Sequence, residues 1–78
     1  MSWNYRVVED DFEGEKYFGI HEVYYDTSGQ PESCSELPAR VSAESLEGVR
    51  GELVRMLEAL EKPPLPASLF GDESATKT

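Results

Sequence analysis

The chain has 78 residues, and its 16 acidic and 7 basic side chains give a net charge of −9 at pH 7. This length accommodates one small domain, whose core supplies only about 3–5 kcal/mol, and leaves no room for a separate catalytic module. The negative charge disfavours binding to nucleic-acid phosphates, and no segment approaches the roughly 18 apolar residues of a membrane span.

The only cysteine is Cys34, which excludes an intramolecular disulfide, and the Cys and His residues cannot complete a structural zinc site. The first residues lack the basic and apolar regions of a signal peptide. We therefore expect a cytoplasmic protein without a cofactor and away from membranes. Its marginal core favours a protein partner or a weak homodimer.

The start of the chain alternates in the manner of a β-strand. Over residues 3–9, aromatic and β-branched side chains fall on one side of a pleated strand: Trp3, Tyr5 and Val7. The stretch 9–16 is strongly acidic, and Gly14 supplies the backbone freedom that a chain reversal needs. We predict a strand followed by a solvated hairpin loop.

The longest β-prone run, YFGIHEVYY, predicts a second strand over residues 16–26. Its alternation is imperfect, because the apolar residues of its two halves fall on opposite faces. We therefore expect a bulge near His21 and Glu22. Gly19 points the same way, since glycine inside a strand marks a bulge or a close backbone approach.

A turn over residues 26–29, Asp-Thr-Ser-Gly, suits a type I turn closed by glycine in the left-handed region. Beyond Pro31, alternating polar and small residues up to Pro38 suit an edge strand over residues 31–37. The first half of the chain thus predicts a three-stranded antiparallel β-meander.

The clearest pattern is an amphipathic helix from about residue 44 to 61. Six apolar residues recur at helical spacing and form one stripe, which we expect to be buried on the sheet: Leu46, Val49, Leu53, Met56, Leu57 and Leu60. Either Ser42 or Ser45 caps the first turn, and two prolines end the helix. Gly48 and Gly51 lie opposite the stripe, where we favour tolerated surface glycines over a close contact with a second chain.

These elements define an α+β fold, β-β-β-α, over residues 1–62. Residues 63–78 form a proline-rich tail, which we expect to be disordered from about residue 71. The apolar residues Leu65, Leu69 and Phe70 either lie back against the body or stay free.

The acidic loop resembles a calcium-binding loop only in part. Glu9, Asp11, Glu13 and Gly14 match the first, third, fifth and sixth positions of an EF-hand, but Ile20 stands at the twelfth, where a bidentate Glu is required. The flanks also have strand patterns. A solvated loop explains these charges better than calcium binding does.

His21, Glu22 and Tyr24 combine a base, a carboxylate and a phenol in one short segment. Adjacent strand residues point to opposite faces, so His21 and Glu22 share a site only if a bulge turns one of them. Cys34 with His21 is a second nucleophile and base pair, but a small sheet with one helix offers no pocket that excludes water. We expect no catalytic residues.

The strands carry more aromatic side chains than one helix can cover, so some are exposed. We expect a candidate interaction surface among these and neighbouring residues: Trp3, Tyr17, His21, Tyr24, Tyr25 and Val54. Scattered exposed tyrosines also occur without any function.

The segments MSWNYRVV and YFGIHEVYYD, the turn ending in Gly29, and the Leu-Glu-Lys-Pro ending of the helix resemble a set of small uncharacterised bacterial proteins. That resemblance covers roughly residues 1–65 and implies no activity. The order of strands followed by a helix with Glu-Ser-Leu-Glu is similar to the layout of the HicB-type antitoxin domain. The proline-aspartate and glycine-cysteine segment of that family is not matched here.

The sequence therefore predicts a non-enzymatic protein-interaction or structural module. One alternative is a HicB-like antitoxin or acidic inhibitor of a small protein partner. Another is a small ligand-binding protein or enzyme that uses His21, Glu22 and Tyr24.

Overall fold

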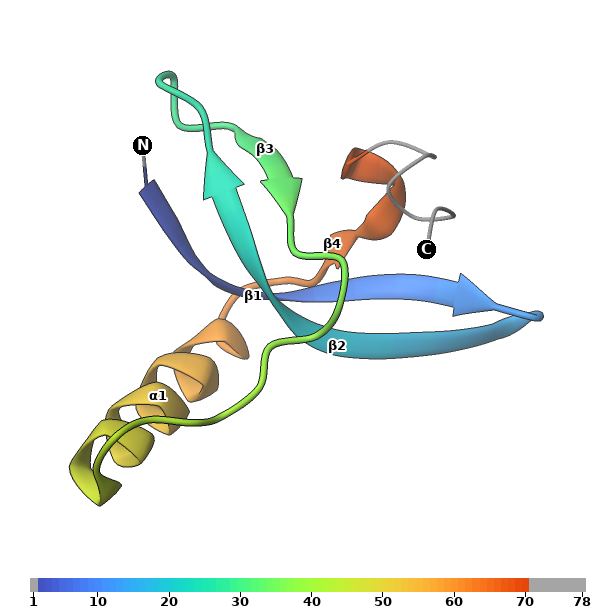
Figure 1. The fold of residues 1–78 in the computed structure, drawn as a ribbon. Coiled ribbons are helices and arrows are strands. Elements are labelled where there is room, and N and C mark those ends of the chain that lie inside the picture. The colour runs from blue at the N-terminus through green and yellow to red at the C-terminus, as the bar shows by residue number, and fades with distance from the viewer. Residues whose placement is uncertain (1, 71–78) are drawn as a thin grey trace.

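The computed structural model describes residues 2–70, which form a curled sheet and one α-helix (Figure 1). The elements in chain order are β1 (Ser2–Phe12), β2 (Glu15–Tyr25), β3 (Pro31–Cys34), α1 (Leu46–Ala59), β4 (Leu65–Pro66) and the 3-10 helix η1 (Ala67–Phe70). The strand order is β3-β2-β1-β4, antiparallel except for the parallel pair of β1 and β4. The α+β class and the meander before the helix are confirmed, and β4 is an addition.

The first hairpin is longer than the sequence indicated. β1 and β2 pair without interruption up to Phe12 and Glu15, and only Glu13 and Gly14 turn the chain, with φ angles of 52° and 82°. Positive φ at both positions is the geometry of a two-residue type I′ turn. The prediction of a long loop over residues 9–16 is wrong, because charged residues can pair in a ribbon that is solvated on both faces.

The predicted bulge near His21 and Glu22 is also wrong, since the register of β1 with β2 is unbroken there. Phe18 stays exposed on the hairpin, so no bulge is needed to bring it into the core. The irregularity lies between Tyr24 and Tyr25, in the pairing of β2 with β3. Gly19 marks a close approach instead, because a Cβ there would lie 3.3 Å from His21 Nε2.

The second turn follows the prediction. The Asp26 carboxylate accepts hydrogen bonds from the backbone of Gln30 and Ser28, each at 2.9 Å, and Gly29 has a φ of 88°. These donors, that of Gln30 first, lower the pKa of Asp26. β3 is an edge strand as expected, but it ends at Cys34 rather than residue 37.

One face of the sheet carries α1. Residues paired across β1 and β2 share a face, which places Tyr5, Val7 and Ile20 together. Tyr5 and Val7 are buried in one cluster with Met56 and Ala59 of α1. The predicted placement of Tyr5 and Val7 on one side of the strand is therefore confirmed, and this is the side that carries α1.

The opposite face has a second small core. Val8 and Val23 lie on that face and are the most buried residues of β1 and β2. η1 contacts both β1 and β3, which flank β2, and therefore crosses this face. In Figure 1, α1 lies below the crossing of β1 and β2, whereas η1 lies above it beside β3.

α1 begins at Leu46 because Ser45 caps it: the Ser45 hydroxyl accepts a hydrogen bond from the Gly48 amide at 3.0 Å. Of the two candidate caps, Ser45 is the one used. The helix ends at Ala59. Its leucines are exposed, so the prediction that the whole apolar stripe is buried is wrong.

The segment after the helix lies against the body. β4 pairs with β1 at Val8 and Glu9, and the Arg6 guanidinium donates a hydrogen bond to the Pro63 carbonyl at 3.0 Å. The expected disorder from residue 71 concerns residues outside the described range. None of the helices formed by residues 2–70 has the length and apolar character that crossing a bilayer requires.

Candidate protein-binding surface

The contact of α1 with the sheet is narrow. It consists of Met56 and Ala59, beside a hydrogen bond from the Tyr5 hydroxyl to the Glu52 carboxylate. This bond, together with burial, raises the pKa of Tyr5 to about 12, and it lowers the pKa of Glu52. The polar bond fixes which side of the helix lies over the sheet.

Four leucines lie on a neighbouring side of α1, which we call the leucine face: Leu46, Leu53, Leu57 and Leu60. Their exposed fractions are 88%, 52%, 63% and 62%, and Val54, which borders the face, is 49% exposed. At 100° per residue, the four leucines fall within an arc of about 60°, turned about 100° from the arc of Glu52, Met56 and Ala59. The helix thus presents one apolar face to the sheet and a larger one to solvent.

The leucine face is exposed because the sheet offers few apolar partners. On the side of β1 and β2 that faces the helix, the apolar residues nearest α1 are Tyr5, Val7 and Ile20. Glu22 is paired with Tyr5 on that same face and accepts a hydrogen bond from the Tyr24 hydroxyl. A hydrogen-bonded carboxylate in this position interrupts the apolar surface on which a row of leucines could pack.

Charged residues of both signs lie along the outward edge of the leucine face. By helical geometry, Arg50 lies between Leu57 and Val54, Glu47 lies beyond Val54, and Glu61 follows the C-cap residue Leu60. The last turn of α1 contains no basic residue. The C-terminal end of the helix, near Leu57 and Leu60, carries the partial negative charge of the helix dipole.

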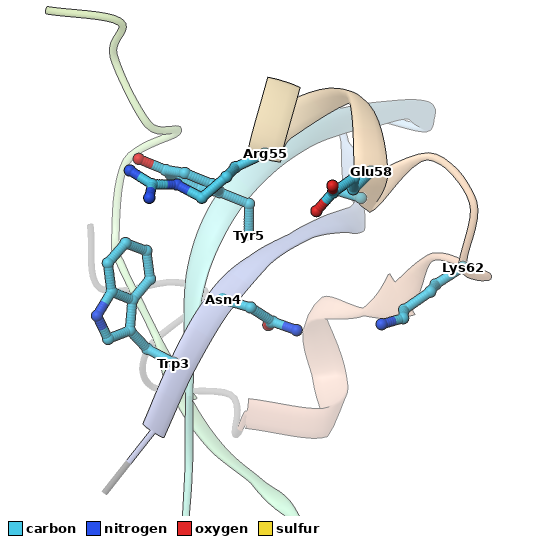
Figure 2. Close-up of a pocket in the computed structure, with 7 residues that line it drawn as sticks. Trp3, Asn4, Tyr5, Arg55, Glu58 and Lys62 are labelled. Carbon is cyan, nitrogen blue, oxygen red and sulfur yellow. The ribbon is translucent and has the colours of Figure 1, made fainter. Parts of the chain in front are cut away.

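A hollow of about 300 Å³ lies on the other side of the helix, between β1 and α1 (Figure 2). Trp3 and Lys62 stand at its two ends, with Arg55 and Glu58 projecting from α1. Arg55 also forms an ion pair with Glu52 at 3.1 Å. The hollow is open and its walls carry charges of both signs, so it selects no class of ligand.

The six residues expected to form an interaction surface do not form one patch. Trp3 and Tyr24 are paired on the helix side of the sheet, whereas Tyr17, His21 and Tyr25 lie on the opposite side. Val54 is exposed on α1. Of these residues, Val54 alone borders the leucine face.

The aromatic residues have local structural roles. Trp3 packs edge-to-face on Tyr5 at 5.3 Å between ring centroids, and Tyr17 packs in the same way on Phe12. The Tyr25 hydroxyl donates a hydrogen bond to the Asn4 side chain at 2.8 Å. These contacts account for the tyrosines and tryptophan within the sheet and its hairpin.

His21 and Glu22 point to opposite faces, as the alternation of a strand requires. His21 Nδ1 lies 2.9 Å from the Ser35 carbonyl oxygen, and Glu22 is engaged by Tyr24. Burial raises the pKa of the Cys34 thiol, which disfavours the nucleophilic thiolate. The structure therefore brings no base, carboxylate and phenol together at these positions.

The acidic hairpin residues lie along a ribbon rather than around a loop. Glu9 forms an ion pair with Lys16 at 2.8 Å. Within residues 2–70, no three side chains of His, Cys, Asp or Glu lie close enough to hold a metal ion.

The sequence analysis did not predict that the leucine face is exposed. Helical periodicity shows which residues of a helix are apolar but not whether the sheet has apolar residues to pack against them. One signal was available: Glu52 lies at the edge of the predicted stripe next to Met56, and Glu22 lies among the strand residues expected to pack against it. A helix with more apolar residues than its sheet can cover indicates an exposed face.

Comparison with known proteins adds no relative: no family model, no curated protein and no solved structure matches the chain significantly. The resemblances to the small bacterial proteins and to the HicB-type domain stay predictions.

Proposed function

We propose that this chain is a non-enzymatic protein-interaction module, which binds another protein through the leucine face of α1. The observation that carries the proposal is the exposure of four leucines along one side of a helix whose sheet contact uses a different side. Small monomeric proteins rarely leave a continuous apolar patch of this kind in water. We also propose a cytoplasmic location, on the sequence grounds given above.

The apolar area of the leucine face is large enough to contribute to binding but too small to give high affinity by itself. The exposed parts of the four leucines and Val54 amount to about three whole side chains, so burying them would contribute roughly 5–9 kcal/mol. Association itself costs about 4–15 kcal/mol. Apolar burial alone therefore gives weak affinity, and a stable complex needs further contacts.

The chain itself does not supply a cover for this face among the described residues. The apolar side chains that follow the helix belong to β4 and η1, which contact β1 and β3 instead. Residues 71–78, Gly-Asp-Glu-Ser-Ala-Thr-Lys-Thr, contain no large apolar side chain that could fill a row between leucines. These points support an occupant from outside the chain.

An enzyme that uses His21, Glu22 and Tyr24 is the weaker candidate, because these side chains are divided between two faces. An acidic inhibitor of a small protein would be one form of the interaction module, and the net charge of −9 favours it over a neutral binding protein.

The test is differential capture of partners from cells of the organism that makes the protein. Three forms of the full chain are used as bait: the wild type, the double variant Leu53→Ser, Leu57→Ser, and the control Leu37→Ser. Leu37 is 75% exposed and lies outside the helix, so the control removes a similar apolar side chain from another surface. We expect one protein to be retained by the wild type and the control and lost with the double variant.

The retained protein is then purified and its dissociation constant is measured with each bait. Equal affinity for all three forms, or capture of nothing that depends on Leu53 and Leu57, would contradict the proposal. Circular dichroism of the double variant must match the wild type, since both positions are solvent-exposed.

A further inference from the structure

The edge of β1 that faces away from β2 is partly free. The Glu22 carbonyl of β2 accepts a hydrogen bond from the Ser35 amide, so the backbone groups of Glu22 point away from β1. In an antiparallel pair, two opposite residues either bond to each other or both point outward, and these two kinds of pair alternate. Tyr5 is opposite Glu22, and Trp3 lies two residues before it. The amide and carbonyl groups of Tyr5 and Trp3 therefore point to the outer edge of β1.

The chain itself adds a strand to this edge. β4 pairs in parallel with β1 at Val8 and Glu9, but it is only two residues long. Nearer the start of β1, no backbone hydrogen bond formed among residues 2–70 reaches Trp3 or Tyr5 from the outer side. Two donors and two acceptors are thus unpaired on the same edge that β4 has already extended.

The hollow between β1 and α1 includes this free stretch (Figure 2). Trp3 and Tyr5 line it from β1, and Ala59 and Arg55 line it from α1. Its volume of about 300 Å³ is at the lower end of the range for binding pockets. The charges on its walls favour no ligand, but its unpaired backbone groups favour one conformation. Only an extended segment presents amides and carbonyls at the spacing of a neighbouring strand.

We propose that the hollow is a strand-addition site, in which an extended peptide segment of another protein pairs with Trp3 and Tyr5 of β1 and continues the line of β4. In this mode of recognition, main-chain hydrogen bonds give affinity and alternate side chains give specificity. Every second side chain of the added segment turns toward the helix side of the sheet, where an apolar residue packs on the exposed part of the Trp3 ring. The site shares no residue with the leucine face.

Hydrogen exchange measured by NMR tests the free edge in the chain alone. The amides of Asn4 and Arg6 point toward β2, whereas that of Tyr5, between them, points outward. We expect the Tyr5 amide to exchange roughly tenfold or more faster than the Arg6 amide. Equal protection of the two amides would mean that a segment of the chain already occupies the edge, and would overturn the proposal.

The probe for binding is a blocked pentapeptide, acetyl-Thr-Val-Thr-Val-Thr-amide, titrated into the isotope-labelled full chain. We expect saturable binding with Kd on the order of 1 mM, because each exposed hydrogen bond contributes little in net terms. The amide signals of Trp3 and Tyr5 should shift most, and exchange of the Tyr5 amide should slow. No shift of these signals at several millimolar peptide would contradict the proposal.

Two derivatives of the peptide test whether its backbone makes the contact. One carries N-methyl groups on the valines and the other on the threonines. Because the amides of a strand point alternately to its two sides, only one of these sets faces β1. We expect one derivative to lose binding and the other to keep it, whereas equal effects would show that side chains alone are recognised.

Variants of the chain locate the site. Trp3→Pro removes the outward amide at this position and spares the pairing of β1 with β2, whereas Trp3→Ala removes the ring and keeps the amide. We expect Trp3→Pro to bind the pentapeptide roughly threefold more weakly than Trp3→Ala. The variant Leu53→Ser, Leu57→Ser should bind it like the wild type. Equal affinity of the two Trp3 variants, or loss of binding in the leucine variant, would overturn the strand-addition site and leave the proposal for the leucine face unaffected.

Discussion

Two neighbouring residues of α1, Met56 and Leu57, should respond in opposite ways to the same substitution. Met56 is buried against Tyr5 and Val7, whereas Leu57 is 63% exposed. Replacing a buried Met by Ala typically costs 2–5 kcal/mol, and the low end applies where a small cluster can relax. We expect Met56→Ala to cost about 2 kcal/mol, a large part of the total for a chain of this size.

Leu57→Ala removes much less. Only about a third of its side chain is withdrawn from water, which is worth roughly 0.5–1 kcal/mol, and the better helix propensity of alanine offsets part of this loss. We expect a net cost of about 0.5 kcal/mol or less. The sequence pattern alone assigned Leu57 to the core and would give it the same cost as Met56.

Urea unfolding followed by far-UV circular dichroism measures both costs, with the slope m checked for constancy. In thermal unfolding, Met56→Ala should lower Tm by roughly 8–16 °C. Measurements at two protein concentrations are the control for self-association. If Leu57→Ala destabilises the chain as much as Met56→Ala at low concentration, the leucine face is buried in the monomer and the reasoning fails.

Three further outcomes are expected. Gly51→Ala should stabilise the chain by about 1 kcal/mol, because no atom lies within 4 Å of the added Cβ. Gly48→Ala should give no such gain, because its Cβ would lie 2.8 Å from the Cβ of Ala43. Equal gains in the free energy of unfolding in urea would contradict this expectation. Ser45→Ala should cost about 1 kcal/mol but Ser45→Gly only a few tenths, and equal costs would mean that the hydroxyl is not the cap. In an ultraviolet pH titration, Tyr5 should ionise near pH 12, so its contribution to stability is complete below about pH 10 and is lost as the pH rises through 12. Glu52→Gln should lower that pKa, and an unchanged titration would exclude the hydrogen bond as its cause.

Local signals were enough to predict the elements of the meander and the helix. The turn at Asp26 and Gly29 was predictable from the sequence because the Asp26 carboxylate accepts backbone hydrogen bonds within the turn and Gly29 adopts the positive φ that closes it. The cap at Ser45 was readable to within one of two serines. In both cases the contacts lie within five residues, where the sequence itself gives the spacing.

Contacts between distant segments were not readable in the same way. β4 is two residues long, includes Pro66 and pairs with β1 from the far end of the chain. No local pattern predicts such a short parallel pair. Likewise, the periodicity of α1 predicted a helix correctly but not which apolar residues meet the sheet, because that depends on Glu22 and on the bond between Tyr5 and Glu52.

The candidate site shows the same limit. The residues singled out from the strands, such as His21 and Tyr24, were chosen for their chemistry, and the structure engages them in local hydrogen bonds. The leucine face lay within the segment assigned to the core. An exposed apolar face can be recognised only when the positions of all the side chains that could pack against it are known.

The acidic residues of the hairpin formed by β1 and β2 also bear on aggregation of the chain. β4 reaches only Glu9 and β3 pairs no further along β2 than Val23, so among residues 2–70 the distal ribbon has no neighbouring strand at either edge. Open edges with exposed aromatic residues such as Phe12 and Phe18 are templates for strand addition and fibril growth. Five carboxylates and one ammonium group occupy this ribbon and its turn: Glu9, Asp10, Asp11, Glu13, Glu15 and Lys16. Mutual repulsion between these charges opposes the pairing of ribbons at neutral pH, and we expect acidification to make the hairpin the first part of the molecule to aggregate.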